Sequence, residues 1–560
     1  MTRSRSARPH ARPAWLERLT REEPTSLGDF TATLRVLPVA ILAVGIGVLS
    51  GFVALGLLDL IGLFTNLFFF HRFRLDLVSP AGHSLGAWLV AVPLAGGLIV
   101  GLMARYGSEK IRGHGIPEAI EAILMRGSRV EPRLAVLKPL SSAIAIGSGG
   151  PFGAEGPIIM TGGAFGSLVA QAFHLTSAER KTLLVAGAAG GMTATFGSPL
   201  AAILLAVELL LFEWKPRSFV PVALASAAAM TTRHFLMDSA PLFQVPQHAS
   251  FVGVGSLLAC VVAGLAAGVL SALMTGSVYF FEDLFQERLR RIHWMWWPAI
   301  AGVAIGVGGA ICPRALGVGY DSIGDLLAGR LPIGSTLLLM AVKWGIWSFA
   351  LGSGTSGGVL APLLMLGAAL GSVEATFLPG VAAGFWPLVS MAAILGGTMR
   401  APLTAVVFSL EITHDWDAVL PLCVAVTVAH AFTVLVLRRS ILTEKVSRRG
   451  YHVTREYAID PLEVLFVRDV MRPEPPLAGA SSPGRAHPDE TLRTVSHRMA
   501  STGLTRLVVV HRNGTRVPVG EVTLEDMLKA RRRHLEEETR RERVIPVHRV
   551  FTPWLRPPKR

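Results

Sequence analysis

The residues of this chain whose types and spacing suit chemistry form three short motifs of glycine and proline. They are Gly113-His114-Gly115-Ile116-Pro117, Gly153-Ala154-Glu155-Gly156-Pro157 and Gly358-Val359-Leu360-Ala361-Pro362. Glycine leaves the backbone free to turn, and proline suits the first turn of a helix because its missing N–H would have no intrahelical partner there. Each motif therefore predicts a helix start whose unpaired N–H groups, backed by the helix dipole, attract an anion.

For one motif alone, a helix kink or a close-packing glycine is the simpler interpretation, since both are common in membrane proteins. Three helix starts that converge inside an apolar body would instead replace part of the hydration shell of an anion without using full positive charges. The three motifs together favour this second interpretation. The predicted substrate is a small anion.

Glu155 is an acidic residue at the beginning of the apolar stretch 156–170. A carboxylate at membrane depth costs roughly 2.5–3.5 kcal/mol on insertion scales, so it needs a partner or a function. N–H groups at a helix start would hold it where a substrate anion would otherwise bind. We expect Glu155 to act as a tethered competitor and gate, released by protonation or by an anion. The alternative is an ordinary acidic residue in a first helical turn.

The composition indicates that most of the chain lies in a membrane. Of 560 residues, 51% are hydrophobic and only 16% are charged, against about 25% charged residues in an average soluble domain. Four apolar runs, 38–58, 87–103, 252–270 and 421–437, have about the length that crosses a hydrocarbon core of roughly 30 Å. A soluble enzyme is excluded for this region, and the protein is not expected to be an enzyme. Glycine and proline inside the apolar runs predict broken helices, which are typical of transport proteins.

The net charge of +14 comes largely from Lys and Arg outside the apolar runs. The positive-inside rule explains this distribution better than nucleic-acid binding and places both termini in the cytoplasm. Cys260, Cys312 and Cys423 lie in or beside apolar segments without metal-ligand spacing. We therefore expect packing cysteines, no metal site and no nucleic-acid partner.

The chain divides into a basic arm at 1–37, a membrane domain at 38–450 and a polar tail at 451–560. The membrane domain contains an internal repeat, with halves at about 38–240 and 250–450. Residues 138–167 align with 343–372 at a constant offset of 205, and 12 of 30 positions are identical. Two further pairs of blocks follow the same order at offsets of 203 and 204: Pro199-Leu200-x-Ala202 to Glu208 with Pro402-Leu403-x-Ala405 to Glu411, and Gly113-x-Gly115 with Gly317-x-Gly319.

The three motifs, the repeat and the length together resemble the CLC chloride channel and transporter family, whose patterns are GSGIP, GxEGP and GxFxP in this order. The resemblance covers roughly residues 38–450. It implies an all-α polytopic fold of two inverted-topology repeats with broken helices, and a homodimer with one pore per subunit. Glu155 would be the gating glutamate, and Glu208 and Glu411 would lie near the dimer interface. The implied anion-binding residues are Gly113, His114, Gly115, Ile116, Ala154, Gly156, Val359, Leu360, Ala361 and Leu442, and the helix-start residues are Pro117, Gly153, Pro157, Gly358 and Pro362.

Departures from the family pattern bear on mechanism. His114 replaces the usual serine and either donates an N–H to the anion or packs without touching it. Leu442 stands where the family has a tyrosine ligand, and Leu360 where it has phenylalanine. Proton-coupled members often carry two consecutive acidic residues after the Pro199 block, but here Leu209 follows Glu208. These departures favour a channel over an exchanger.

The tail combines a helical pattern at 490–499, a β-rich run at 504–510 and a turn at Asn513-Gly514. With the segment that follows, it resembles one small α/β CBS motif at about 465–532. In that setting Thr523 and Asp526 would contact the ribose of an adenine nucleotide. Because only one copy is visible, we favour a structural or dimer-stabilising tail without a cofactor.

The sequence therefore predicts a multi-pass protein of a lipid bilayer, in a prokaryotic plasma membrane, that carries chloride or a similar small anion and is gated by Glu155. The main alternative is a proton-coupled chloride exchanger of the same fold. A fluoride or nitrate transporter is a further alternative because of His114. A divalent-cation transporter would need more acidic or amide ligands than these motifs offer.

Overall fold

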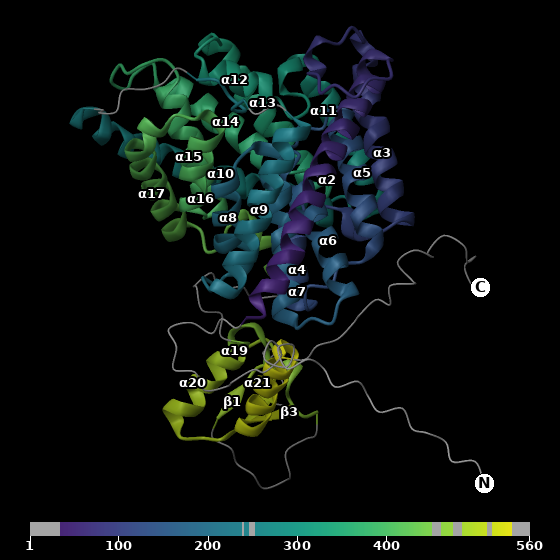
Figure 1. Cartoon of the computed structure of the whole chain (residues 1–560), viewed down its shortest axis with the longest axis vertical. Helices are drawn as coiled ribbons and strands as arrows, with labels where there is room; N and C mark the ends of the chain where they lie inside the picture. The colour runs from purple at the N-terminus through teal and green to yellow at the C-terminus, as the bar shows by residue number, and fades with distance from the viewer. Residues whose placement is uncertain are drawn as a thin grey trace.

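The computed structural model describes residues 34–237, 240–245, 253–450, 461–473, 484–511 and 518–539. Most of the predicted basic arm and the Asn513-Gly514 turn lie outside the described residues. The described chain forms a large helical domain and a small α/β tail beneath it (Figure 1). The predicted fold class is confirmed.

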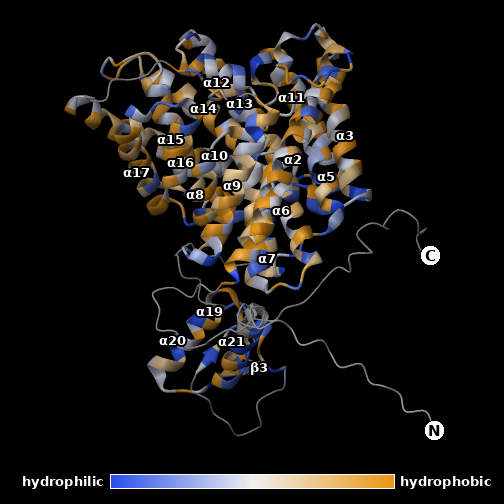
Figure 2. Cartoon of the chain, viewed as in Figure 1, coloured by the Kyte–Doolittle hydropathy of each residue, from blue (hydrophilic) through white to orange (hydrophobic). Residues whose placement is uncertain are grey.

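Long apolar helices build the membrane domain. Six helical segments in the described part of the chain are long and apolar enough to cross a membrane: Val36–Phe70, Gly86–Tyr106, Val254–Glu287, Trp294–Ile311, Ile333–Gly352 and Trp416–Arg448. They contain α2 (Val36–Phe70), α3 (Ala91–Tyr106), α10 (Val254–Glu287), α11 (Trp297–Ile311), α13 (Ile333–Gly352), α17 (Val419–Val436) and α18 (Ile441–Arg448). The four apolar runs predicted as spans overlap α2, α3, α10 and α17. Figure 2 shows hydrophobic residues along this domain and hydrophilic ones gathered toward its ends and in the tail.

The helices around the three motifs occur as two matching sets, one in each half of the repeat. The first half contains α4 (Ile116–Met125), α5 (Pro132–Gly147), α6 (Glu155–Ala172), α7 (Ser177–Phe196), α8 (Pro199–Leu205), which continues as a π-helical turn (Ala206–Leu211), and α9 (Pro216–Leu236). In the second half, α12 (Tyr320–Leu327), α13, α14 (Leu360–Glu374), α15 (Phe385–Met399), α16 (Pro402–Thr413) and α17 follow in the same order. Short 3₁₀ turns lie at Pro80–Gly82, Gly86–Val90, Glu109–Ile111, Trp294–Trp296, Pro313–Ala315, Trp416–Ala418 and Val467–Asp469.

The two halves stabilise each other through reciprocal helix caps. Glu411, in α16, accepts hydrogen bonds from two N–H groups in the first turn of α8, at 2.8 and 2.9 Å. Glu208, in the first half, accepts in return from the N–H groups of Leu403 and Thr404 at the start of α16, at 3.2 and 2.9 Å. A carboxylate at a helix start satisfies orphan N–H groups and complements the helix dipole. The repeat is therefore held together by its own repeated residues.

The tail contains α19 (Pro461–Val464), α20 (Leu492–Thr502), α21 (Leu524–Thr539) and a sheet of β1 (Arg485–Ala486), β2 (Arg506–Val510) and β3 (Pro518–Thr523). Strand β2 lies in the centre, parallel to β1 and antiparallel to β3. The tail has a small hydrophobic core of its own, in which Leu492, Leu507 and Val522 are fully buried. The helix and strands predicted for this region are present.

One prediction about the cysteines is wrong. Cys260 and Cys312 are buried, as expected of packing residues, but Cys423 is exposed. It lies in α17, where several neighbouring apolar side chains, such as Leu420, are also exposed. Apolar character is a poor guide to burial here, because a helix at the edge of the membrane domain turns part of its apolar surface away from the rest of the chain.

Candidate functional site

The starts of α4, α6 and α14 lie close together, where the two halves of the repeat meet. Gly153 and Gly358, which precede α6 and α14, exchange two backbone hydrogen bonds of 2.9 and 3.2 Å. A methyl group on Gly156 would meet the Cα of Gly358 at 3.3 Å and would overlap the carbonyl oxygen of His114. The second glycine motif therefore lies against the backbone of both the first and the third, as expected if the three form one site.

The loop before α4 has a backbone that requires glycine. Gly113 and Gly115 have φ angles of +89° and +91°, which side chains with a Cβ rarely adopt. The N–H of Gly115 donates to the Glu118 carboxylate at 2.7 Å, so this start is already capped. His114 between them is 3% exposed, and its Nδ1 has no hydrogen-bond partner within the described ranges. This ring nitrogen is thus buried without a hydrogen bond from the described protein.

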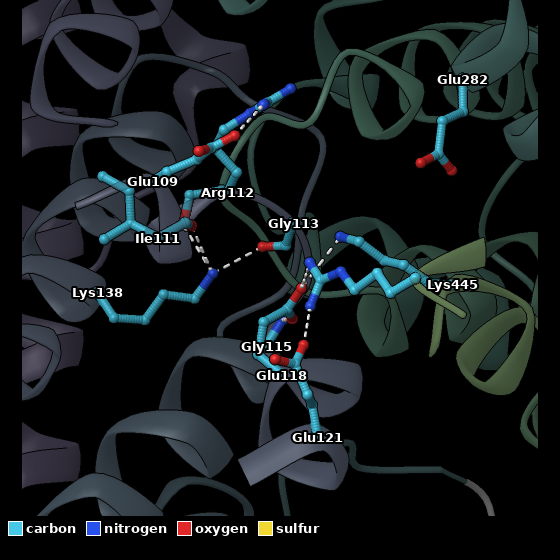
Figure 3. Close-up of polar contacts among 12 residues, drawn as sticks. Glu109, Ile111, Arg112, Gly113, Gly115, Glu118, Glu121, Lys138, Glu282 and Lys445 are labelled. Carbon is cyan, nitrogen blue, oxygen red and sulfur yellow. Dashed lines mark hydrogen bonds and ion pairs between the residues drawn. The ribbon is translucent and has the colours of Figure 1, made fainter. Parts of the chain in front are cut away.

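Two buried lysines, to which the sequence analysis gave no role, hold the loops of this region. Lys138 Nζ donates to the carbonyls of Ile111 and Gly113 at 2.8 and 2.7 Å (Figure 3). Lys343 Nζ donates to the two equivalent carbonyls of the second half, at 3.1 and 2.8 Å. The sequence contained a signal for this role, because the two lysines occupy identical positions of the repeat and lie in stretches with few other charges.

Glu155 is the first residue of α6 and is 1% exposed. Its carboxylate faces the backbone N–H of Ala361, in the first turn of α14, and the hydroxyl of Tyr320 at the start of α12. A methyl group on Gly358 would lie 2.9 Å from its Oε2. Neither carboxylate oxygen has a partner with hydrogen-bond geometry among the described residues. The group therefore lies among helix starts that attract anions, without being bound firmly to any of them.

The remaining predicted site residues are also placed near these helix starts. Ile116, Pro117, Ala154, Pro157, Val359, Leu360 and Pro362 are all buried, and they belong to the first turns of α4, α6 and α14 or immediately precede them. Leu442 is fully buried in the first turn of α18. Its side chain offers no hydrogen bond.

Ion pairs connect α18 to α4. Lys445 and Arg449 contact the Glu118 carboxylate at 3.2 and 3.1 Å (Figure 3), and Arg449 also pairs with Glu121. Because Glu118 caps the His114 loop, these contacts link the last helix of the membrane domain to the first anion motif.

A cavity of about 610 Å³ opens beside this cluster, with His114 in its wall. The charged residues that line it are Lys110, Arg112, Arg126, Arg129, Lys445, Arg448, Arg449, Glu109, Glu118, Glu121, Glu131 and Glu282. Seven cations line the cavity against five carboxylates, and a net positive lining favours small anions over cations.

The inner acidic positions are structural. Leu209 is fully buried, and the carboxylate of Glu208 is engaged by the start of α16, including the Thr404 hydroxyl at 2.6 Å. Glu213 forms ion pairs with Lys215 and Arg217 at 3.4 and 3.6 Å. The carboxylates of Glu208 and Glu213 are therefore both bound to other groups of the protein.

In the tail, Thr523 and Asp526 bind each other. Asp526 Oδ2 accepts from the Thr523 hydroxyl at 2.7 Å, and Oδ1 accepts from Arg472 at 2.9 Å. Although burial pushes the pKa of Asp526 upward, the hydrogen bonds from Thr523 and Arg472 lower it below the usual value. These contacts secure the start of α21.

The described residues contain no group of three or more His, Cys, Asp or Glu that could hold a metal ion.

The chain matches the family model described as voltage gated chloride channel over residues 96–434 and the CBS domain model over 467–533. It is 30% identical over 410 residues to the H(+)/Cl(-) exchange transporter ClcA of Salmonella arizonae, covering 69% of this chain and 84% of that protein. The same transporter of Salmonella paratyphi B is 29% identical over the same shares.

Solved structures share the fold. A slow cyanobacterial Cl-/H+ antiporter matches with a TM-score of 0.66 and 20% identity, over 73% of this chain and 97% of that one. A eukaryotic CLC transporter matches with a TM-score of 0.64 and 18% identity, over 88% of this chain and 98% of that one. The family model, the ClcA relatives and these neighbours show that the chain belongs to the CLC family, as a multi-pass membrane protein that transports chloride or a similar small anion and carries a C-terminal CBS domain.

Proposed function

We propose that the protein conducts its anion through a pathway gated by Glu155, without obligatory exchange for protons. The position of the Glu155 carboxylate carries this proposal. It is buried at the start of α6 and faces the start of α14, where N–H groups favour negative charge. An anion entering this place competes with the tethered carboxylate, so the pathway opens when Glu155 is displaced or protonated.

The inner half of the pathway supports transport without coupled protons. An exchanger needs a protonatable group that carries the proton from Glu155 to the cytoplasm. Leu209 is apolar and buried, and Glu208 is committed to capping α16. The basic cavity beside His114 favours anions on this side, and four of its five carboxylates are held in ion pairs, while Glu282 accepts a hydrogen bond from Gln286.

A proton-coupled exchanger is the second candidate. The curated relatives at 29–30% identity are named as H(+)/Cl(-) exchange transporters. In this chain His114 is the proton carrier that we would propose, because it is buried next to the Gly156 backbone and also borders the cavity. An imidazole with an unpartnered ring nitrogen can accept and release a proton.

Proton movement driven by a chloride gradient distinguishes the two candidates. Liposomes with the purified protein are given a chloride gradient, and external pH and chloride are recorded for the native chain and for His114→Asn. Our proposal predicts chloride flux without opposing proton flow in both proteins. Proton flow in the native chain that disappears in His114→Asn would establish the exchanger. If chloride does not move, fluoride and nitrate are tested in the same vesicles.

We also propose a homodimer in a prokaryotic plasma membrane, with both termini in the cytoplasm. Leu200 and Leu403, in the first turns of α8 and α16, are 52% and 53% exposed beside the reciprocal glutamate caps, and paired exposed apolar residues suit an interface between copies. Leu200→Cys should form a disulfide between two copies under mild oxidation, whereas the native chain, with Cys423 exposed, should not.

For the tail we propose a structural role, without a resident nucleotide. The contacts among Thr523, Asp526 and Arg472 occupy the groups that a ribose would need. Titration of the purified protein with ATP and AMP tests this proposal. Saturable binding that is lost in Asp526→Asn would contradict it.

A further inference from the structure

Tyr320 is a polar side chain that the gating account above does not use. It is the first residue of α12, directly after Gly319, whose φ is +81°. The side chain is partly buried, but its hydroxyl oxygen is buried and has no hydrogen-bond partner among the residues described. Leaving a buried hydroxyl unsatisfied costs about 1–3 kcal/mol. This cost suggests that the hydroxyl has a ligand in a working state of the protein.

The hydroxyl faces a second unsatisfied group, the carboxylate of Glu155. The Tyr320 hydroxyl and the Glu155 carboxylate are neighbours, but the geometry between them does not meet the criteria for a hydrogen bond. Lys343 Nζ, which faces the same carboxylate, would lie 3.8 Å from a methyl group on Gly319. A hydroxyl donor, a carboxylate acceptor and the start of α14 thus surround one place.

The rest of the pathway gives this donor a specific task. On the tail side, His114 is the one anion-site candidate whose side chain has a polar hydrogen, because Leu442 has none. On the other side, Glu155 repels an anion once it is deprotonated. Lys343 Nζ is already bound to two carbonyls, so without Tyr320 the described residues at the end of the pathway away from the tail would offer an anion chiefly backbone N–H groups. Figure 1 places α12 at the end of the membrane domain opposite the tail.

We propose that the Tyr320 hydroxyl is the side-chain hydrogen-bond donor at the end of the anion pathway away from the tail. It faces the Glu155 carboxylate when that group occupies the helix starts, and it donates to the transported anion when the carboxylate has left. Tyr320 thereby supplies a hydroxyl ligand in a chain that has leucine at position 442. The inference rests on the proposed function, because it concerns the same pathway.

A purely structural role for Tyr320 depends on its ring and not on its hydroxyl. The ring packs edge-on against Phe243, with centroids 6.2 Å apart. Phenylalanine would keep this packing and would also remove the cost of the unsatisfied hydroxyl. Tyr320→Phe therefore separates the two roles with a change of one atom.

The test measures chloride binding by isothermal titration calorimetry on full-length protein in detergent. Glu155→Ala, in which the competing carboxylate is absent, is compared with Glu155→Ala/Tyr320→Phe. The matched control is Glu155→Ala/Tyr106→Phe, because Tyr106 is 80% exposed at the end of α3. Chloride efflux from liposomes is recorded for the same three proteins, and gel filtration establishes that each is folded.

Since a hydrogen bond to a charged group is worth about twice a neutral one, Tyr320→Phe should weaken chloride binding about tenfold. Thiocyanate, which accepts hydrogen bonds weakly, should lose less affinity than chloride, and the Tyr106 control should match Glu155→Ala. Equal chloride affinity in all three proteins, with efflux intact, would overturn the role of Tyr320 and leave the proposed function standing. Absence of both chloride binding and efflux in Glu155→Ala would instead contradict the proposed function, and this inference with it.

Discussion

The two halves of the membrane domain have the same scaffold but different chemistry. Lys138 and Lys343 make the same pair of carbonyl contacts, and Glu208 and Glu411 exchange the same helix caps. The residues that face the anion site do not correspond. His114, Glu155 and Ile116 of the first half align with Val318, Leu360 and Tyr320 of the second.

This difference separates residues that build the pathway from residues that operate it. A symmetric scaffold provides helix starts from both sides, but one carboxylate is enough to block a single pathway, and a second would repel the first. We therefore expect equivalent substitutions to have equal effects at scaffold positions and unequal effects at operating positions.

The largest effect is expected at the buried lysines. Lys138→Met and Lys343→Met each leave at least two buried carbonyls without a donor, at about 1–3 kcal/mol for each unsatisfied group. Both variants should lose several kcal/mol of stability, by similar amounts. Thermal unfolding followed by gel filtration measures this loss. A large effect of one lysine and no effect of the other would show that the scaffold is not symmetric.

His114 and its equivalent in the second half, Val318, are expected to contribute unequally to chloride binding. His114→Val, which copies the second half, removes a side-chain donor and should weaken chloride binding by about three- to tenfold, the worth of one hydrogen bond. Val318→Ala should leave chloride affinity within about twofold. Calorimetric titration with chloride measures both. Unchanged affinity in His114→Val would mean that the histidine packs without touching the anion.

The smallest effect is expected in the tail, which lies outside both halves. Thr523→Ala removes a hydrogen bond that caps α21, and loss of such a cap costs about 1 kcal/mol. Amide exchange in α21 should speed up roughly fivefold at pH 7, while chloride affinity stays unchanged.

The tail contact also predicts a pH dependence. The pKa of Asp526 is lowered by its partners although burial raises it, so its contribution is present at neutral pH and lost as the pH falls through the lowered pKa. The difference in exchange between the native chain and Thr523→Ala should therefore shrink below the ordinary aspartate value of 3.8. An unchanged difference under acid would argue against a role for the charged form.

Local signals explain why much of this architecture could be predicted. Glycine and proline at short spacing mark the starts of α4, α6 and α14, and the repeat is visible as identities at a constant offset. The tail strands and helices follow ordinary periodicity. Each of these signals lies within a few consecutive residues.

Contacts between distant segments could not be predicted in this way. Glu411 caps a helix that begins about 200 residues earlier, and no local pattern identifies that partner. The start of α12 was missed because it lacks the proline of the other starts, so Tyr320 did not stand out. The exposed Cys423 shows the same limit, since a sequence does not say which side of an apolar helix packs against the rest of the chain.

Chloride efflux from liposomes for Glu155→Ala and for Leu360→Ala tests the central claim most directly, because these positions are equivalent in the repeat. The account predicts that Glu155→Ala raises efflux at neutral pH at least tenfold and abolishes its increase under acid, whereas Leu360→Ala keeps the pH dependence of the native chain. Efflux that keeps the same rate and pH dependence in Glu155→Ala would contradict a carboxylate gate at the start of α6.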